Sequence, residues 1–179
     1  QKGKGRASCT DLMVYNQNKA FCIEAKRTEH LYSNVKRWLL EGDLENRKLV
    51  LSGWLELINN RCGTAIQIPD VLDCTYQIIH RFASACNMSG DTELNYYLYN
   101  SKNDSDNQGI YLKELIGLRK LFGNSVPIKL YMFNLFSNEL YISYEVSYNG
   151  RISNFSDRIQ QLMMEGKIFD ISLKEKIDI

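Results

Sequence analysis

The chain has 179 residues, a formal net charge of +1 and no apolar run long enough to cross a membrane. These properties exclude a membrane-spanning protein and a strongly basic protein that coats nucleic acid, and we expect one domain over residues 1–179. The five cysteines are odd in number and form no CxxC pair, and no signal-peptide pattern is present, so reduced thiols and a cytoplasmic location are expected.

The first predicted elements are two strands that form a hairpin over about residues 8–26. Both strands alternate apolar and polar residues, as a half-buried strand does, and the polar stretch at 16–19 between them has turn chemistry. Whether the loop has two or four residues, the numbers of paired residues sum to thirty-five. Asp11 is therefore expected opposite Glu24, with Lys26 on the same face as Glu24.

Two carboxylates at such a distance repel each other unless a cation or a proton lies between them. Mg²⁺ favours one or two carboxylates and keeps several waters, and a neighbouring ammonium can orient a water or stabilise charge on a phosphate. Asp11, Glu24 and Lys26 therefore point to hydrolysis of a phosphodiester by a metal-activated water.

The pattern Thr10-Asp11, a short hairpin and Ile23-Glu24-Ala25-Lys26 resembles the PD-(D/E)xK nuclease superfamily, with Thr10 in place of the proline. The resemblance covers about residues 3–30 closely and the rest by the order of elements. It implies an α/β fold, with a restriction-endonuclease-like core of mixed β-sheet flanked by helices. The competing interpretation is a surface hairpin with a solvated Glu-Lys pair.

The resemblance also implies roles for individual residues. Asp11, Glu24 and the backbone carbonyl of Ala25 would coordinate Mg²⁺ or Mn²⁺, and Lys26 would position the attacking water and help to deprotonate it. Glu29 is a supporting candidate, although an acid favoured by the dipole at a helix N-terminus explains it equally well.

One departure from the superfamily concerns the segment before the hairpin. Members usually carry a further acid on a helix before the first motif strand, and only ten residues precede Asp11. The missing initiator methionine suggests that the numbering starts inside a longer polypeptide. Either that helix precedes residue 1, or the site has fewer ligands and holds one metal ion.

Basic residues surround the predicted hairpin, whereas few acids occur before residue 40. A basic rim around an acidic metal site suits a phosphate backbone, and a solvated basic face is the alternative for each residue. The candidate nucleic-acid-binding residues are Lys2, Lys4, Arg6, Arg27, Lys36 and Arg37.

A helical block follows over about residues 30–87, longer than the minimal nuclease fold needs, so we interpret it as an insertion or an elaborated crossover. Apolar stripes predict helices at 30–41 and 46–61, and a third from Pro69 to Cys86.

The remaining elements, over about residues 93–165, begin with a βαβ unit, whose two strands should be parallel. The predicted elements are a strand at 93–100, a loop at 102–109, a helix at 111–122, strands at 127–136 and 139–148, and a short helix at 157–165. In the helix at 111–122, the residues expected to point inward are Leu112, Leu115, Ile116 and Phe122.

The predicted function is a metal-dependent endonuclease that acts on DNA, of the restriction or repair type. A cap-snatching RNA endonuclease of a viral polymerase and a catalytically inactive nucleic-acid-binding module on the same fold are the alternatives. Homodimers are common among such nucleases. A further hypothesis is that Tyr96, Tyr97 and Tyr99 form a base-stacking platform.

Overall fold

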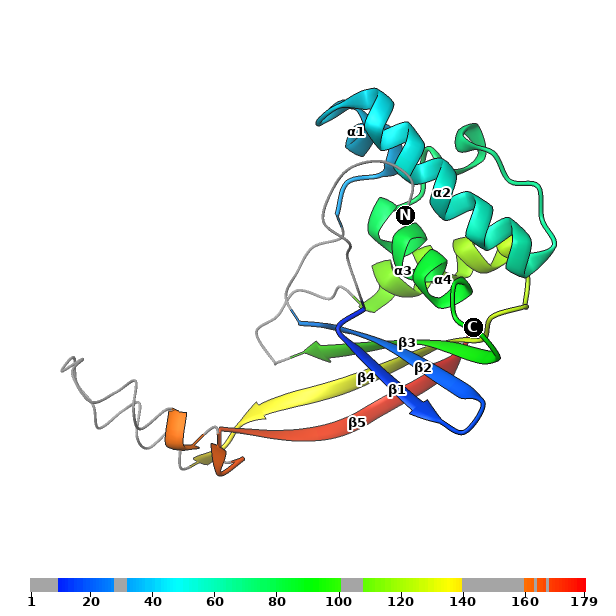
Figure 1. Ribbon diagram of the computed structural model, residues 1–179. Coiled ribbons are helices and arrows are strands. Elements are labelled where there is room, and N and C mark those ends of the chain that lie inside the picture. Colours follow the sequence, from blue (N-terminus) through cyan, green and yellow to red (C-terminus); the bar gives the residue numbers. More distant parts are fainter. Residues whose placement is uncertain (1–9, 28–31, 101–107, 140–159, 163, 167) are drawn as a thin grey trace.

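The computed structural model describes residues 10–27, 32–100, 108–139, 160–162, 164–166 and 168–179. It is an α/β structure in which a five-stranded mixed sheet carries helices on one face (Figure 1). No helix among the described residues is both long and apolar enough to span a membrane. The elements, in chain order, are β1 (Leu12–Asn16), β2 (Lys19–Lys26), α1 (Val35–Leu40), α2 (Leu44–Cys62), the 3-10 helix η1 (Ile68–Val71), α3 (Tyr76–Cys86), β3 (Asp91–Asn100), α4 (Gln108–Phe122), β4 (Ile128–Ser137) and β5 (Phe169–Asp178).

The strands follow one another across the sheet in the order β1-β2-β3-β4-β5. β1 and β2 are antiparallel, β2, β3 and β4 are mutually parallel, and β5 returns antiparallel to β4. The predicted βαβ unit is thus confirmed by β3, α4 and β4. The helices α1, α2 and α3 form the long crossover that a parallel connection from β2 to β3 requires.

The hairpin has the predicted register. Leu12 pairs with Ile23 and Met13 pairs with Cys22, so paired residue numbers sum to thirty-five. The loop consists of two residues, of which Gln17 adopts a positive φ of 50°, a conformation common in tight hairpin turns.

The first predicted helix is wrong at its start. α1 begins at Val35, where the side chain of Asn34 caps it by accepting a hydrogen bond from the backbone N–H of Arg37. α2 agrees with its prediction to within two residues at its start and one at its end, and it ends at Gly63 in the left-handed conformation, with φ 67°.

The third predicted helix is two separate elements. Pro69 lies in η1, and the chain then turns before Thr75, the N-cap residue of α3. The apolar stripe continued through this break because residues on both elements contact the same core.

α4 also departs from its prediction in two details. It begins at Gln108, so Gly109 lies in the helix and not in the preceding loop. Ile116 was expected to point inward but is 40% exposed, whereas Tyr111 and Leu118 are buried. Leu115 and Phe122 are buried as predicted, so Ile116 is the residue of the stripe that was placed wrongly.

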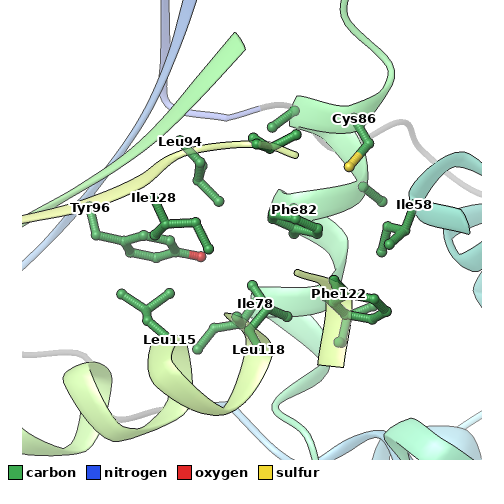
Figure 2. Close-up of a cluster of buried hydrophobic side chains, with 14 of the residues drawn as sticks. Ile58, Ile78, Phe82, Cys86, Leu94, Tyr96, Leu115, Leu118, Phe122 and Ile128 are labelled. Carbon is green, nitrogen blue, oxygen red and sulfur yellow. The ribbon is translucent and has the colours of Figure 1, made fainter. Parts of the chain in front are cut away.

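The core lies between the sheet and the helices. Figure 2 shows Leu94, Tyr96 and Ile128 from the strands facing Phe82 and other side chains of α2, α3 and α4. Strand residues alternate in burial along β2 and β4, since only the face towards the helices is covered by them.

The C-terminal part of the chain differs most from expectation. β5 was not predicted, and it supplies the antiparallel neighbour of β4. The strand predicted at 139–148 lies, apart from Glu139, outside the described residues. Of the helix predicted at 157–165, residues 160–162 and 164 are helical, whereas 157–159 and 163 lie outside the described residues.

Candidate active site

Glu24 and Lys26 lie at the carboxyl end of β2, on the face of the sheet that the helices cover. Strand alternation puts both side chains on this face, which also carries the buried Cys22, and leaves Ala25 on the opposite face and exposed. Glu24 has no solvent exposure and Lys26 has 6%. A charged pair buried to this extent needs partners, because an isolated charge in the interior is very costly.

Asp11 lies immediately before β1 and is exposed. Its Oδ2 atom accepts a hydrogen bond of 2.9 Å from the backbone N–H of Ala25, the residue between Glu24 and Lys26. The structure therefore brings Asp11 to the strand segment that carries the other two predicted residues.

Two cations hold the Glu24 carboxylate. Lys26 Nζ lies 2.9 Å from Glu24 Oε1, and Arg81 Nε lies 2.6 Å from Glu24 Oε2. Among the described residues neither oxygen accepts a well-directed hydrogen bond, so these are close charge contacts. We refer to Asp11, Glu24, Lys26 and Arg81 as the Glu24 cluster.

Arg81 was missed by the sequence analysis. It lies on α3 among the buried residues Ile78, Phe82 and Ala85, and is itself 7% exposed. The available signal was a guanidinium within a run of apolar helix residues, which demands an acid nearby. The sequence does not show which acid this is.

Tyr96 on β3 is the direct neighbour of Glu24 in the parallel pairing. Its side chain is buried, and its hydroxyl has no hydrogen-bond partner among the described residues. Burial, and secondarily the charge of Glu24, hold the pKa of the Tyr96 phenol well above its ordinary value. A neutral phenol therefore lies beside the cluster. The Thr10 hydroxyl, next to Asp11, is likewise buried without a partner among the described residues.

Aromatic side chains lie beside the cluster on the helical side. Lys26 Nζ lies 5.9 Å from the centre of the Tyr32 ring, and Tyr32 makes an edge contact with Tyr76 of α3 at 5.8 Å. Such faces attract a cation and restrict the access of water to it.

The other predicted residues either lie outside the described residues or are exposed on the surface. Glu29, Lys2, Lys4 and Arg6 lie outside the described residues. The Arg27 guanidinium is exposed and lies 5.6 Å from the centre of the Phe169 ring. Lys36 and Arg37 are exposed on α1, where Arg37 contacts Glu41 at 2.8 Å.

The donor set fits a hard divalent cation only in part. No group of three or more His, Cys, Asp or Glu side chains suited to a metal ion occurs in the described part of the chain. Asp11, Glu24 and the Ala25 carbonyl could supply two carboxylates and one neutral oxygen, which satisfies Mg²⁺ when waters complete the shell. Within the described part of the chain, the oxygens of Glu24 accept no directed hydrogen bond, but both are contacted by cations.

The three tyrosines of β3 do not form one platform. Tyr96 is buried on the helix-covered face, while Tyr97 and Tyr99 lie on the opposite face. There they contact β4, with ring centres 4.9 Å apart for Tyr97 and Tyr131 and 5.0 Å apart for Tyr99 and Phe133.

Comparison with known proteins gives a family without an assigned activity. The model of the family described as "Domain of unknown function (DUF6946)" matches residues 1–126. None of the curated proteins matches the chain, and no solved structure matches it. The match spans well over half of the sequence, and the chain belongs to the DUF6946 family.

Proposed function

We propose that this member of the DUF6946 family is a metal-dependent endonuclease that hydrolyses phosphodiester bonds, with DNA as its substrate. The observation that supports this most is the arrangement of Asp11, Glu24 and Lys26 at one end of the hairpin. Asp11 is bonded to the backbone between the other two, and Glu24 and Lys26 are held side by side in the interior.

The position of the cluster in the sheet also supports the proposal. It lies at the carboxyl end of β2, where β2 and β3 run parallel, and ligands of α/β sheets bind outside the carboxyl ends of strands. A hairpin that carries the acidic motif, followed by crossover helices and a parallel strand, is the arrangement that a restriction-endonuclease-like core would have.

Each residue has a definite task in this proposal. Asp11, Glu24 and the Ala25 carbonyl would hold Mg²⁺ or Mn²⁺, which supplies a more acidic water and stabilises charge on the phosphate. The Lys26 ammonium would orient that water and donate to a phosphate oxygen. The nucleic-acid backbone would be contacted by Lys2, Lys4, Arg6, Arg27, Lys36 and Arg37. Glu29 would support the metal site. A homodimer would cut both strands of the duplex.

The test is cleavage of supercoiled plasmid, single-stranded DNA and RNA with Mg²⁺, Mn²⁺ or EDTA, comparing the native protein with Lys26→Ala. We expect metal-dependent cutting of plasmid that Lys26→Ala lowers by at least about a hundredfold, the usual size of a proton-transfer or charge-stabilising contribution. Lys48→Ala is the matched control: it removes an exposed cation paired with Glu45 on α2, outside the proposed site, and should cut at close to the native rate.

The substrate panel separates the alternatives. Cutting confined to RNA would favour the RNA endonuclease. Absence of cutting from a folded protein on every substrate would contradict the proposal, as would cutting that Lys26→Ala leaves unchanged.

A nucleic-acid-binding module is the second candidate, favoured by a different observation. The face of the sheet opposite the helices carries a row of contacting rings, formed by Tyr97, Tyr99, Tyr131 and Phe133. Lys129 lies on the same face, two positions before Tyr131 on β4. Rings with nearby cations suit stacked bases. Binding of a labelled single strand without cleavage, equally strong in native protein and Lys26→Ala, would favour this function.

A further inference from the structure

The charges of the Glu24 cluster already cancel. Two carboxylates, Asp11 and Glu24, lie with two cations, Lys26 and Arg81, and the side chains of Glu24, Lys26 and Arg81 are all buried. A site whose carboxylates served only to bind a divalent cation would have unpaired carboxylates and a strong negative potential. Here the carboxylate of Glu24 is neutralised before any metal ion arrives.

Lys26 contacts one oxygen of the Glu24 carboxylate, and Arg81 contacts the other. The Nε atom of Arg81 lies 2.6 Å from Oε2, whereas Lys26 Nζ lies 2.9 Å from Oε1. A cation that binds Oε2 must therefore approach the position of a guanidinium. At separations of a few ångströms, like charges repel each other even at the effective dielectric constant of a protein interior.

The two cations differ in how they are held. Lys26 lies two positions from Glu24 on the same strand, so the backbone of β2 fixes its place. Arg81 belongs to α3, a separate element, and reaches Glu24 through a long side chain with several rotatable bonds. Movement of the Arg81 side chain alone would therefore free Glu24 Oε2 and leave both β2 and Lys26 in place.

We propose that Arg81 is a positioning residue that neutralises Glu24 in the metal-free protein and competes with the metal ion for the same carboxylate oxygen, so that Arg81 sets the metal affinity of the site. This inference rests on the metal site of the proposed function. It makes Glu24 a shared ligand of a guanidinium and a metal, and it makes the folded state independent of metal.

A matched comparison exists on the other face of the sheet. Glu93 on β3 is 2% exposed and is also held by two cations, with Lys19 Nζ at 3.0 Å and Lys129 Nζ at 2.6 Å from Oε2. Removing Lys129 repeats the loss of one cation from a buried glutamate at a place where no metal is proposed. Lys129→Gln therefore controls for a general effect of such a loss.

The experiment measures the dissociation constant of Mn²⁺ from the free Mn²⁺ signal in electron paramagnetic resonance, at a temperature where each variant is folded. The proteins are native protein, Arg81→Gln, Arg81→Lys, Asp11→Asn and Lys129→Gln. We expect Arg81→Gln to bind Mn²⁺ at least about tenfold more tightly than native protein, since one adjacent positive charge is gone. Arg81→Lys and Lys129→Gln should bind like native protein, and Asp11→Asn should lose binding.

The outcomes separate this inference from the proposed function. If native protein binds Mn²⁺ through Asp11 and Arg81→Gln binds equally or less tightly, Arg81 is merely structural, and the metal site remains. If Arg81→Lys gains affinity as Arg81→Gln does, charge competition is wrong. If neither native protein nor Arg81→Gln binds Mn²⁺, the metal site of the proposed function is overturned, and the competition with it.

The stability of Arg81→Gln with and without Mn²⁺ provides a second test of the inference. Arg81→Gln leaves Glu24 with one buried cation, so a lower melting temperature without metal is expected, and Mn²⁺ should raise it more than in native protein. Should Arg81→Gln be unfolded without metal, circular dichroism during a Mn²⁺ titration decides. Folding induced by Mn²⁺ supports the inference, and a chain still unfolded at Mn²⁺ concentrations that saturate native protein contradicts it.

Discussion

Two buried glutamates on opposite faces of the sheet show how single residues place charge in this protein. Glu24 is held by a strand lysine and a helix arginine, and Glu93 by two strand lysines. Burial alone would raise the pKa of Glu93, but hydrogen bonds from Lys129 and Lys19 outweigh it, so that this pKa lies below its ordinary value. Ionised Glu93 therefore stabilises the fold.

This pKa predicts how stability depends on pH. Because the folded-state pKa of Glu93 is below the unfolded value near 4.5, its contribution is present above that value and is lost as the pH falls through the folded pKa. We expect Lys129→Gln to lower the free energy of unfolding at pH 7 by about 1–3 kcal/mol and to weaken the loss of stability below pH 4.5. Urea unfolding at several pH values measures both effects.

Arg37→Gln is the control for that prediction. Arg37 contacts Glu41 at 2.8 Å on the surface of α1, where its side chain is 77% exposed. An exposed pair contributes little, so the free energy of unfolding should change by about 0.5 kcal/mol or less at every pH. A larger effect for Arg37→Gln than for Lys129→Gln would contradict the argument that burial decides how much an ion pair contributes to the free energy of unfolding.

At the scale of elements, Gly117 within α4 and Gly123 directly after its end differ in one property. Within the described part of the chain, and apart from chain neighbours and the backbone of the helix, no atom lies within 4 Å of the position that a Cβ would take at Gly117 or at Gly123, so neither glycine is required for space. Gly117 lies inside the helix, whereas Gly123 follows its end with φ 72°. Only the second glycine is required by its backbone conformation.

Alanine substitution should therefore have opposite effects at the two positions. Gly117→Ala should raise the free energy of unfolding by about 0.5–1 kcal/mol, because alanine loses less conformational freedom in a helix. Gly123→Ala should lower it by about 1–2 kcal/mol, because a Cβ is strained in the left-handed region. Chemical denaturation of both variants checks the pair, and equal signs would show that α4 ends differently.

At the scale of the molecule, the core joins elements that are far apart in the chain. Phe82 of α3 is 1% exposed and stacks on Phe122 of α4, with ring centres 5.5 Å apart, in the layer that also faces β3 and β4 (Figure 2). A void at this point would affect α3, α4 and the sheet together.

Phe82→Ala should lower the free energy of unfolding by about 3–5 kcal/mol, through lost burial and the cavity that remains. Phe136→Ala is the matched control at the end of β4, where the side chain is 40% exposed, and it should cost no more than about 1 kcal/mol. Urea unfolding gives both values. Similar losses would mean that the layer between sheet and helices is not the main source of stability.

The sequence by itself determined the local features of this protein. The hairpin register followed from period-two alternation and a short polar turn, because a slip by one residue would expose the buried Cys22 and Glu24. The parallel βαβ unit and α2 followed in the same way from periodicity and terminators. The break between η1 and α3 and the strand β5 did not, since packing and pairing with distant elements decide them.

Only the tertiary structure decided how the charge of Glu24 is balanced by a cation from another element. Arg81 is far from Glu24 in the chain, and its contact with Oε2 depends on how α3 packs over the sheet. Lys36 and Arg37, in contrast, remain exposed on the surface of α1. Short-range spacing fixes which residues share a strand face, whereas burial of an opposite charge from another element requires the complete fold.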